Sequence, residues 1–244
     1  MSAQLLIYEN AVPVSRSRHA NTSVQLGEYS FTKSVNSVPL IAVEFPLAAS
    51  EYPIVFAGNE KAVMPAAILG LRNNENLFVN AEGKWDAKYI PAFVRRYPFV
   101  FSSQDEGKSF TLCIDERFAG LNQEGKGQRL FAEDGKASPY TDNVLKFLQE
   151  YQAQFQRTQA FCGKLRELDL LEPMQAQVTL GSGEKMSLSG FMVVSRERLK
   201  KLGGETLAKL AATDELELIY VHLQSMRNFG TMRSRLGTSA GQAA

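Results

Sequence analysis

The segment 85–99 is the part of the sequence best suited to chemistry. It holds the only tryptophan of the chain, Trp85, and the consecutive residues Arg95, Arg96 and Tyr97. An arginine beside aromatic rings can hold a carboxylate or phosphate through two hydrogen bonds, or it can stack on a ring. The sequence therefore predicts a site for an anionic or aromatic ligand, with these four residues as candidate ligand-binding residues.

A purely structural interpretation of the same segment competes with this one. Tyr89, Phe93 and Tyr97 are spaced four residues apart, as on the buried face of a helix. Arg95 and Arg96 would then turn their charged ends outward into solvent. The sequence favours this second interpretation and leaves the first one open.

Two further residues are candidates for the same ligand site because their surroundings are unusual. Glu44 lies in the apolar run Ile41–Phe45, so its carboxylate is either paired or on an exposed edge. His222 is four residues from both Leu218 and Met226. A histidine on such a face is more often a hydrogen-bonded core residue than a base, although its titration near neutral pH keeps a functional role open.

No catalytic or metal-binding constellation emerges from the remaining residues. The only histidines, His19 and His222, are far apart, and His19 lies in a polar stretch expected at the surface. The two cysteines lie in apolar segments, so the chain lacks a ligand set for a metal. We predict neither a metal nor a cofactor. The sequence favours a protein that is not an enzyme and leaves that question open.

The amino-acid composition restricts the kinds of molecule that this protein is expected to bind. The chain has 27 basic and 26 acidic residues and a net charge of +1, whereas nucleic-acid binding requires a clustered basic surface. No apolar stretch approaches the length of a membrane span. The N-terminus lacks the pattern of an export signal. We therefore expect a cytoplasmic protein without nucleic-acid partners or a membrane span, and surface association only by another export route.

Short apolar runs between turn-forming residues predict antiparallel β-sheet hairpins. Large apolar residues recur at every second position in Phe99 and Phe101, and again in Phe110, Leu112 and Ile114. This period of two is typical of a hairpin with one buried face. Strands are also expected at Leu5–Tyr8, Ile54–Phe56, Val63–Leu69, Leu77–Val79, Val178–Leu180, Met186–Leu188 and Phe191–Val194.

One long amphipathic helix is the clearest element of the sequence. Ser138 and Pro139 form a suitable start, and Pro173 marks the predicted end. Helices are also predicted for Val38–Ser50, Ala87–Tyr97 and the C-terminal part of the chain, where Asp214 could cap a helix with an apolar face. The buried stripe of the long helix has a spacing of four and three residues: Val144, Leu148, Tyr151, Phe155, Thr158, Cys162 and Leu165.

These elements predict an α+β fold, with antiparallel β-sheet hairpins packed against one long amphipathic helix and C-terminal helices. Strands on both sides of the long helix favour one domain over residues 1–236. Residues 237–244 are small and polar, and we expect them to be a disordered tail.

Several motifs resemble the bacterial SapC family, in the same order and over nearly the whole chain, from about Leu5 to Leu236. The most specific of them is Tyr89–Phe99. The motifs are Asn36–Leu40, Ala42–Phe45, Glu51–Phe56, Tyr89–Phe99 and Leu170–Pro173.

The resemblance implies a setting for this protein and no catalytic residues. The family is named after a locus for a paracrystalline surface layer, and many members are encoded near flavin-dependent halogenase-like enzymes and outer-membrane receptors. The first hypothesis is therefore a non-catalytic binding or accessory protein that assists a peptide- or metabolite-modifying enzyme or a surface component. The alternatives are an enzyme or a binding domain for a small molecule or peptide, with an anion or aromatic pocket near Arg95 and Arg96, and a structural component of a surface layer.

Both thiols should be reduced, because Cys113 and Cys162 lie in apolar segments and behave as small hydrophobic residues. Titration of the denatured, unreduced protein with a thiol reagent should find both of them reactive. If no thiol reacts, the two cysteines form a disulfide and the prediction fails.

Overall fold

The computed structural model describes residues 5–59, 62–103, 109–179 and 185–240. It confirms the predicted α+β fold with antiparallel sheets. The chain forms two compact units, each made of two separate stretches of sequence, and helix α4 (Pro139–Glu167) contributes residues to both. The first unit comprises Met1–Glu28 and Phe93–Ala153, and the second comprises Tyr29–Ala92 and Gln154–Ala244. The prediction of a single domain over residues 1–236 stays a prediction.

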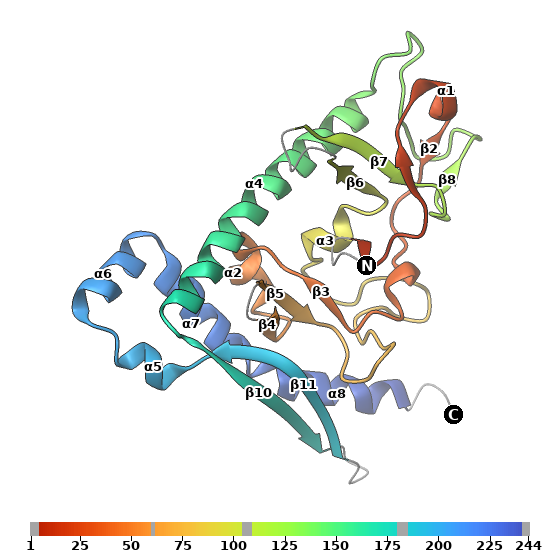
Figure 1. Ribbon diagram of the computed structural model, residues 1–244. Coiled ribbons are helices and arrows are strands. Elements are labelled where there is room, and N and C mark those ends of the chain that lie inside the picture. The colour runs from red at the N-terminus through yellow and green to blue at the C-terminus, as the bar shows by residue number, and fades with distance from the viewer. Residues whose placement is uncertain (1–4, 60–61, 104–108, 180–184, 241–244) are drawn as a thin grey trace. The chain divides into compact units, whose positions relative to one another are not determined.

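The first unit contains two small antiparallel sheets (Figure 1). The predicted hairpin around Phe99 is confirmed, because Phe99 pairs with Ile114 and Phe101 pairs with Leu112. Its connecting residues 104–108 lie outside the described residues. One sheet has the order β1 (Ala11–Pro13), β7 (Thr111–Asp115) and β6 (Phe99–Ser102), and the other has the order β8 (Leu121–Asn122), β2 (Ser23–Val24) and β9 (Gln128–Arg129).

The strand predicted at Leu5–Tyr8 is wrong. These residues form a turn closed by a hydrogen bond from the Tyr8 N–H to the Leu5 carbonyl. The next two N–H groups, of Glu9 and Asn10, donate to the carboxylate of Asp115 instead of to a strand. Pairing with β7 therefore begins only with β1.

The long predicted helix is confirmed as α4. At its start, the side-chain oxygen of Ser138 accepts a hydrogen bond from the Thr141 N–H at 3.2 Å. The helix ends before Asp169, which has a left-handed backbone with φ 52°, so it stops short of Pro173. Pro173 lies in the strand β10 that follows. Five members of the predicted stripe are buried: Leu148, Tyr151, Thr158, Cys162 and Leu165.

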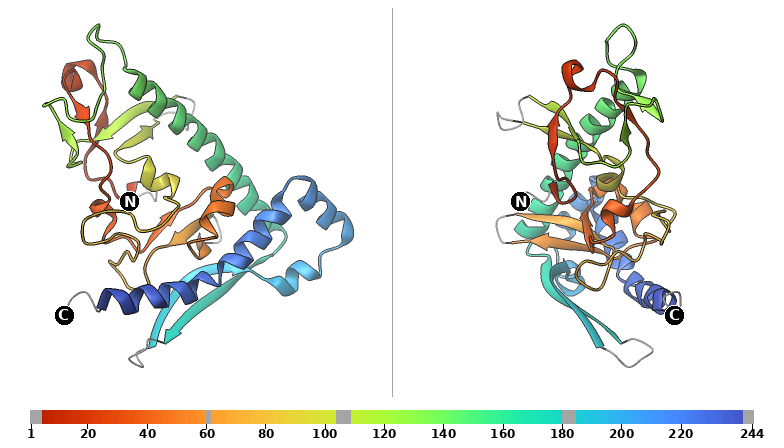
Figure 2. Two further views of the ribbon diagram at one scale, coloured as in Figure 1. Left: turned by 180° about the vertical axis from the view of Figure 1, so that it is seen from behind. Right: turned by 90° about the vertical axis from the view of Figure 1, so that its right-hand side faces the viewer.

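The second unit contains a five-stranded antiparallel sheet. Helix α8 (Asn228–Ala240) lies beside the long β10–β11 pair (Figure 2), and Phe191 stacks on Phe229 with ring centroids 6.0 Å apart. The predicted strand Phe191–Val194 is the end of β11 and not a separate strand. Residues 180–184, between the strands predicted at Val178–Leu180 and Met186–Leu188, lie outside the described residues. The strand order is β10 (Leu171–Thr179), β11 (Lys185–Val194), β4 (Ile54–Gly58), β5 (Val63–Ile68) and β3 (Ser37–Pro39).

Two predicted helices are much shorter than expected. Over Val38–Ser50 the chain begins as β3, and only η3 (Ala42–Glu44) and α2 (Phe45–Ala48) are helical, because Val38 pairs with Ala67 in the sheet. The helix predicted over Ala87–Tyr97 is reduced to α3 (Ala92–Arg95). Pro91 and Pro98 restrict the residues before them to extended backbone and so limit the helix at both ends.

The remaining helices are divided between the units, with α1 (Arg16–His19) in the first unit and the others in the second. Asp214 does not cap its helix as predicted, because it has a left-handed backbone and its side chain makes no capping hydrogen bond. Helix α8 includes residues 237–240 of the segment predicted to be disordered, and residues 241–244 lie outside the described residues. These helices are α1, η2 (Ser30–Thr32), α5 (Arg196–Lys200), α6 (Gly204–Ala212), α7 (Glu215–Ser225) and α8.

Both cysteines are free and buried, as predicted. Burial raises the pKa of the Cys162 thiol to about 12 and also raises the pKa of Cys113. Of the helices in the described part of the chain, none combines the length and apolar character that crossing a bilayer requires.

Candidate functional site

The predicted ligand-binding residues are divided between the two units, because the chain passes from the second unit to the first within the segment 85–99, after Ala92. The first unit holds Arg95, Arg96 and Tyr97, and the second holds Glu44, Trp85 and His222. Each group is therefore described on its own.

A hollow of about 230 Å³ in the first unit brings together Arg95, Arg96 and Tyr97. Its wall is completed by Leu26, by Phe99 of β6 and by the first turns of α4, which contribute Tyr140, Asn143, Val144 and Phe147. Arg95 is exposed, and its guanidinium lies 5.4 Å from the centre of the Phe147 ring. This places a cation at the mouth of a partly aromatic hollow.

Arg96 points inward, unlike an arginine that extends to solvent. Only 4% of the residue is exposed. Its guanidinium lies over three rings, at 4.4 Å from the centre of Phe93, 5.0 Å from Tyr151 and 5.7 Å from Tyr8. Arg96 is therefore held by cation–π contacts inside the first unit.

Tyr140 is the residue of the hollow that the sequence did not single out. Its hydroxyl is buried and has no hydrogen-bond partner among the described residues. Its ring meets Phe99 edge-on at 6.0 Å, and burial raises the pKa of the phenol to about 12. The only signal in the sequence is a tyrosine one residue after Pro139, at the start of a helix, which is too common to indicate a site.

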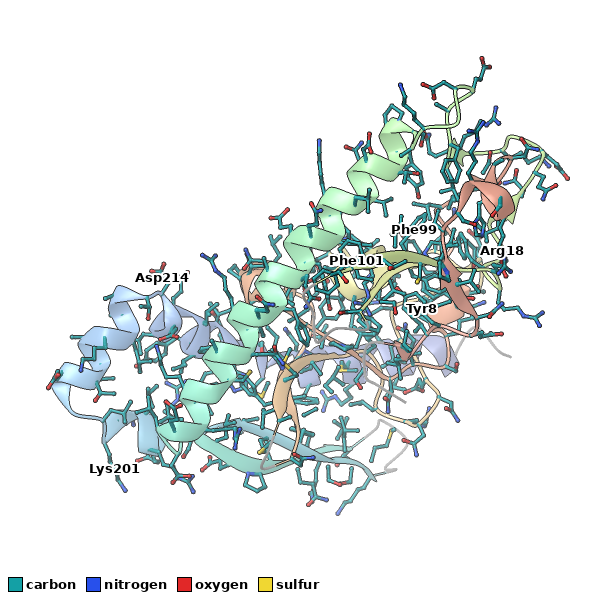
Figure 3. The ribbon with its side chains drawn as sticks, turned by 45° about the horizontal axis from the view of Figure 1, so that its top comes forward. Tyr8, Arg18, Phe99, Phe101, Lys201 and Asp214 are labelled. Carbon is teal, nitrogen blue, oxygen red and sulfur yellow. The ribbon has the colours of Figure 1, made fainter. Side chains whose placement is uncertain are left out.

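Tyr97 is fixed by a buried carboxylate. Its hydroxyl donates to Asp115 Oδ2 at 3.3 Å, and Asp115 is 0% exposed. The same carboxylate accepts the N–H groups of Glu9 at 2.8 Å, Asn10 at 3.0 Å and Arg117 at 3.0 Å. Tyr8 lies beside Tyr97, with ring centroids 5.1 Å apart, and donates to the Phe99 carbonyl at 2.6 Å (Figure 3).

Glu44 and Trp85 meet in the second unit through Tyr89. The Tyr89 hydroxyl donates to Glu44 Oε1 at 2.7 Å, and Trp85 Nε1 donates to the Tyr89 carbonyl at 3.2 Å. Glu44 also accepts the N–H of Ala92 at 2.7 Å and that of Ile41 at 2.9 Å. The sequence left open whether the Glu44 carboxylate is paired or lies on an exposed edge. In the structure it is paired with hydrogen-bond donors, and only 3% of the residue is exposed.

His222 bridges two strands of the sheet in the second unit. Its Nε2 accepts the N–H of Val194 in β11 at 3.0 Å, so its Nδ1 carries the proton and donates to the Ile54 carbonyl in β4 at 2.8 Å. Strands β11 and β4 pair directly only at Met192 and Phe56. The imidazole therefore takes the place of the next ladder hydrogen bonds between these strands. Its predicted part in ligand binding stays a prediction.

His19 lies in the first unit and is buried, which corrects the expected surface position. Only 3% of it is exposed, because its Nδ1 accepts the Ser15 N–H at 3.2 Å within the turn of α1. Its Nε2 lies 3.4 Å from Glu116 Oε1. Among the described residues, no three His, Cys, Asp or Glu side chains gather where they could hold a metal ion.

The comparisons with known proteins place this chain by family alone. The family described as SapC matches residues 14–232. No curated protein and no solved structure matches the chain. The family match agrees with the resemblance of the sequence motifs.

Replacing Glu44 by glutamine should lower the free energy of unfolding by about 1–3 kcal/mol. An amide NH₂ group would face one of the N–H donors that the carboxylate now accepts. Urea unfolding would measure the change, with Glu150→Gln as the control because Glu150 is exposed on α4. Equal stability of the two variants would contradict a structural role for Glu44.

The His222 bridge should make stability depend on pH. Burial lowers the pKa of His222 from 6.5 to about 4 in the folded protein. The neutral ring therefore makes its full contribution to the free energy of unfolding above pH 6.5. This contribution is lost as the pH falls toward 4. The loss should reach about 3 kcal/mol.

Urea unfolding between pH 7 and pH 4 tests this prediction on the wild type and on His222→Gln. The variant should be less stable at neutral pH, and the difference should shrink with acidification. A difference that is constant over this range would show that His222 is not the group responsible.

Proposed function

The chain belongs to the SapC family, and we propose that it is a non-catalytic binding protein that holds the anionic group of a small molecule or peptide in the hollow of its first unit. In this proposal it acts as an accessory to a peptide- or metabolite-modifying enzyme or to a surface component. The observation that carries the proposal is the buried, unpaired hydroxyl of Tyr140 beside the exposed cation of Arg95.

The cost of leaving the Tyr140 hydroxyl unpaired supports a ligand. A buried donor without a partner costs about 1–3 kcal/mol, and an acceptor atom in the hollow would remove that cost. A carboxylate or phosphate oxygen suits both groups, since it accepts from the phenol and pairs with the guanidinium of Arg95. The rings of Phe99 and Phe147 provide apolar contact for the rest of the ligand.

The ionisation of the available groups supports binding over acid–base catalysis. Burial raises the pKa of Tyr97 and of Tyr140, so both phenols stay protonated at neutral pH. Outside the hollow, His222 has both nitrogens in backbone hydrogen bonds, and burial keeps the Cys162 thiol protonated. These groups can donate or pack, but they are poorly matched to proton transfer near pH 7.

Binding of two simple anions, benzoate and inorganic phosphate, tests the proposal by calorimetric or NMR titration. Arg95→Met and Tyr140→Phe should each weaken binding about ten- to a hundredfold, the equivalent of losing about 1.5–3 kcal/mol in hydrogen bonds to a charged group. Tyr140→Phe should leave the melting temperature of the ligand-free protein unchanged or raise it, because the lost hydroxyl has no partner.

Three further variants separate binding from general damage. Arg233→Met changes an exposed arginine in the second unit and should bind as the wild type does. Arg96→Met should mainly lower stability, because Arg96 is buried among three rings. Tyr97→Phe removes one hydroxyl and keeps the ring. Failure of the wild type to bind either anion, or wild-type binding by both Arg95→Met and Tyr140→Phe, would refute the hollow as the site.

A further inference from the structure

A groove of about 570 Å³ lies in the second unit, and none of the residues of the hollow lines it. It lies between η3 and α2 on one side, the C-terminal half of α4 in the middle and the start of α7 on the other side (Figure 1). The described residues that line it belong to helices or to the turn before α7, and none of them belongs to a strand.

Direct bonds tie the walls of the groove together. The N–H of Ala42 in η3 donates to the side chain of Thr158 in α4 at 2.8 Å. Lys164 of α4 pairs with Glu215 of α7 at 2.5 Å. Helix α2 also packs against α7. The groove is therefore formed in advance, so an occupant would not have to order its walls.

The floor and one edge of the groove expose apolar side chains. Val43 lines the groove and is 58% exposed, and Leu47, one helical turn further and outside the lining, is 60% exposed. Pro46 and Ala160, which line the groove, are also exposed. Large apolar residues left in solvent next to a preformed groove mark a surface for a partner.

The opposite edge of the groove is acidic. Asp214 and Glu217 are exposed at the start of α7 and form no ion pair with any described residue (Figure 3 labels Asp214). Glu215 is paired with Lys164, and Arg157 is the basic residue that lines the groove. An occupant with basic side chains along one edge would match this charge distribution.

We propose that this groove docks an amphipathic helix of a partner protein, with an apolar face toward Val43 and Leu47 and with lysine or arginine side chains toward Asp214 and Glu217. A helix fits because helical walls offer no strand edge, so the occupant must satisfy its own backbone hydrogen bonds. The inference extends the accessory role of the proposed function to a partner surface, and it uses none of the residues of the hollow.

The probe for this inference is a fluorescent synthetic peptide of about 18 residues, long enough to form a helix. It carries leucine at helical spacing on one face and lysine elsewhere. One control peptide has the same composition in scrambled order, and a second has glutamate in place of lysine. The full chain should bind the first peptide more tightly than either control, as measured by fluorescence anisotropy, and salt should weaken the binding.

Two pairs of substitutions test the two sides of the groove. Val43→Ser with Leu47→Ser, and Asp214→Asn with Glu217→Gln, should each weaken binding about tenfold or more. Matched controls are Tyr220→Ser, which is exposed on α7 outside the groove lining, and Glu205→Gln on α6. All these positions are at the surface, so melting temperatures should stay close to that of the wild type.

The outcomes separate this inference from the proposed ligand site. Arg95→Met should bind the peptide normally while it loses benzoate, and the groove variants should show the reverse. Equal binding of the three peptides, or unchanged binding by both groove pairs, would overturn the docking surface and leave the hollow unaffected.

Discussion

A buried carboxylate that accepts backbone N–H groups and a tyrosine hydroxyl is the interaction on which each unit depends. Glu44 plays this part in the second unit, and Asp115 plays it in the first. Several of the donors they satisfy lie in irregular segments of the chain, such as Glu9 and Asn10 before β1. Because buried N–H groups without acceptors are costly, these carboxylates allow irregular chain to be packed inside the fold.

The segment 85–99 supplies a tyrosine to each of these carboxylates. Tyr89 donates to Glu44 before the chain leaves the second unit, and Tyr97 donates to Asp115 after it enters the first. Arg96 lies among aromatic rings of the first unit. Much of the motif that carries the family resemblance is thus explained by architecture. The chemistry left for a ligand concentrates at Arg95 and at Tyr140, which lies outside the motif.

Sequence patterns predicted those helices and strands whose formation is indicated by the spacing of nearby residues. The stripe of α4 and the alternation of β6 and β7 are set by periodicity, so both were found. Pairing between segments far apart in the sequence was not predictable. An example is the pairing of β3 with β5, which replaced part of the helix predicted over Val38–Ser50. The unusual position of Glu44 was visible in the sequence, whereas two of its donors, Tyr89 and Ala92, are 45 and 48 residues away. An unpaired hydroxyl such as that of Tyr140 leaves no pattern in a sequence.

Burial also decides what the few reactive side chains of this chain can do. A histidine that accepts one backbone N–H and donates to one backbone carbonyl must stay neutral and fixed, as His222 does between β11 and β4. A thiol with a pKa of about 12 is not a nucleophile at neutral pH, so Cys162 is a poor candidate for a reactive residue. Arg95 and Tyr140 instead combine a permanent cation with a protonated donor in one hollow. Such a pair would stabilise an anion without exchanging a proton with it, which is why we propose recognition and not catalysis for the hollow.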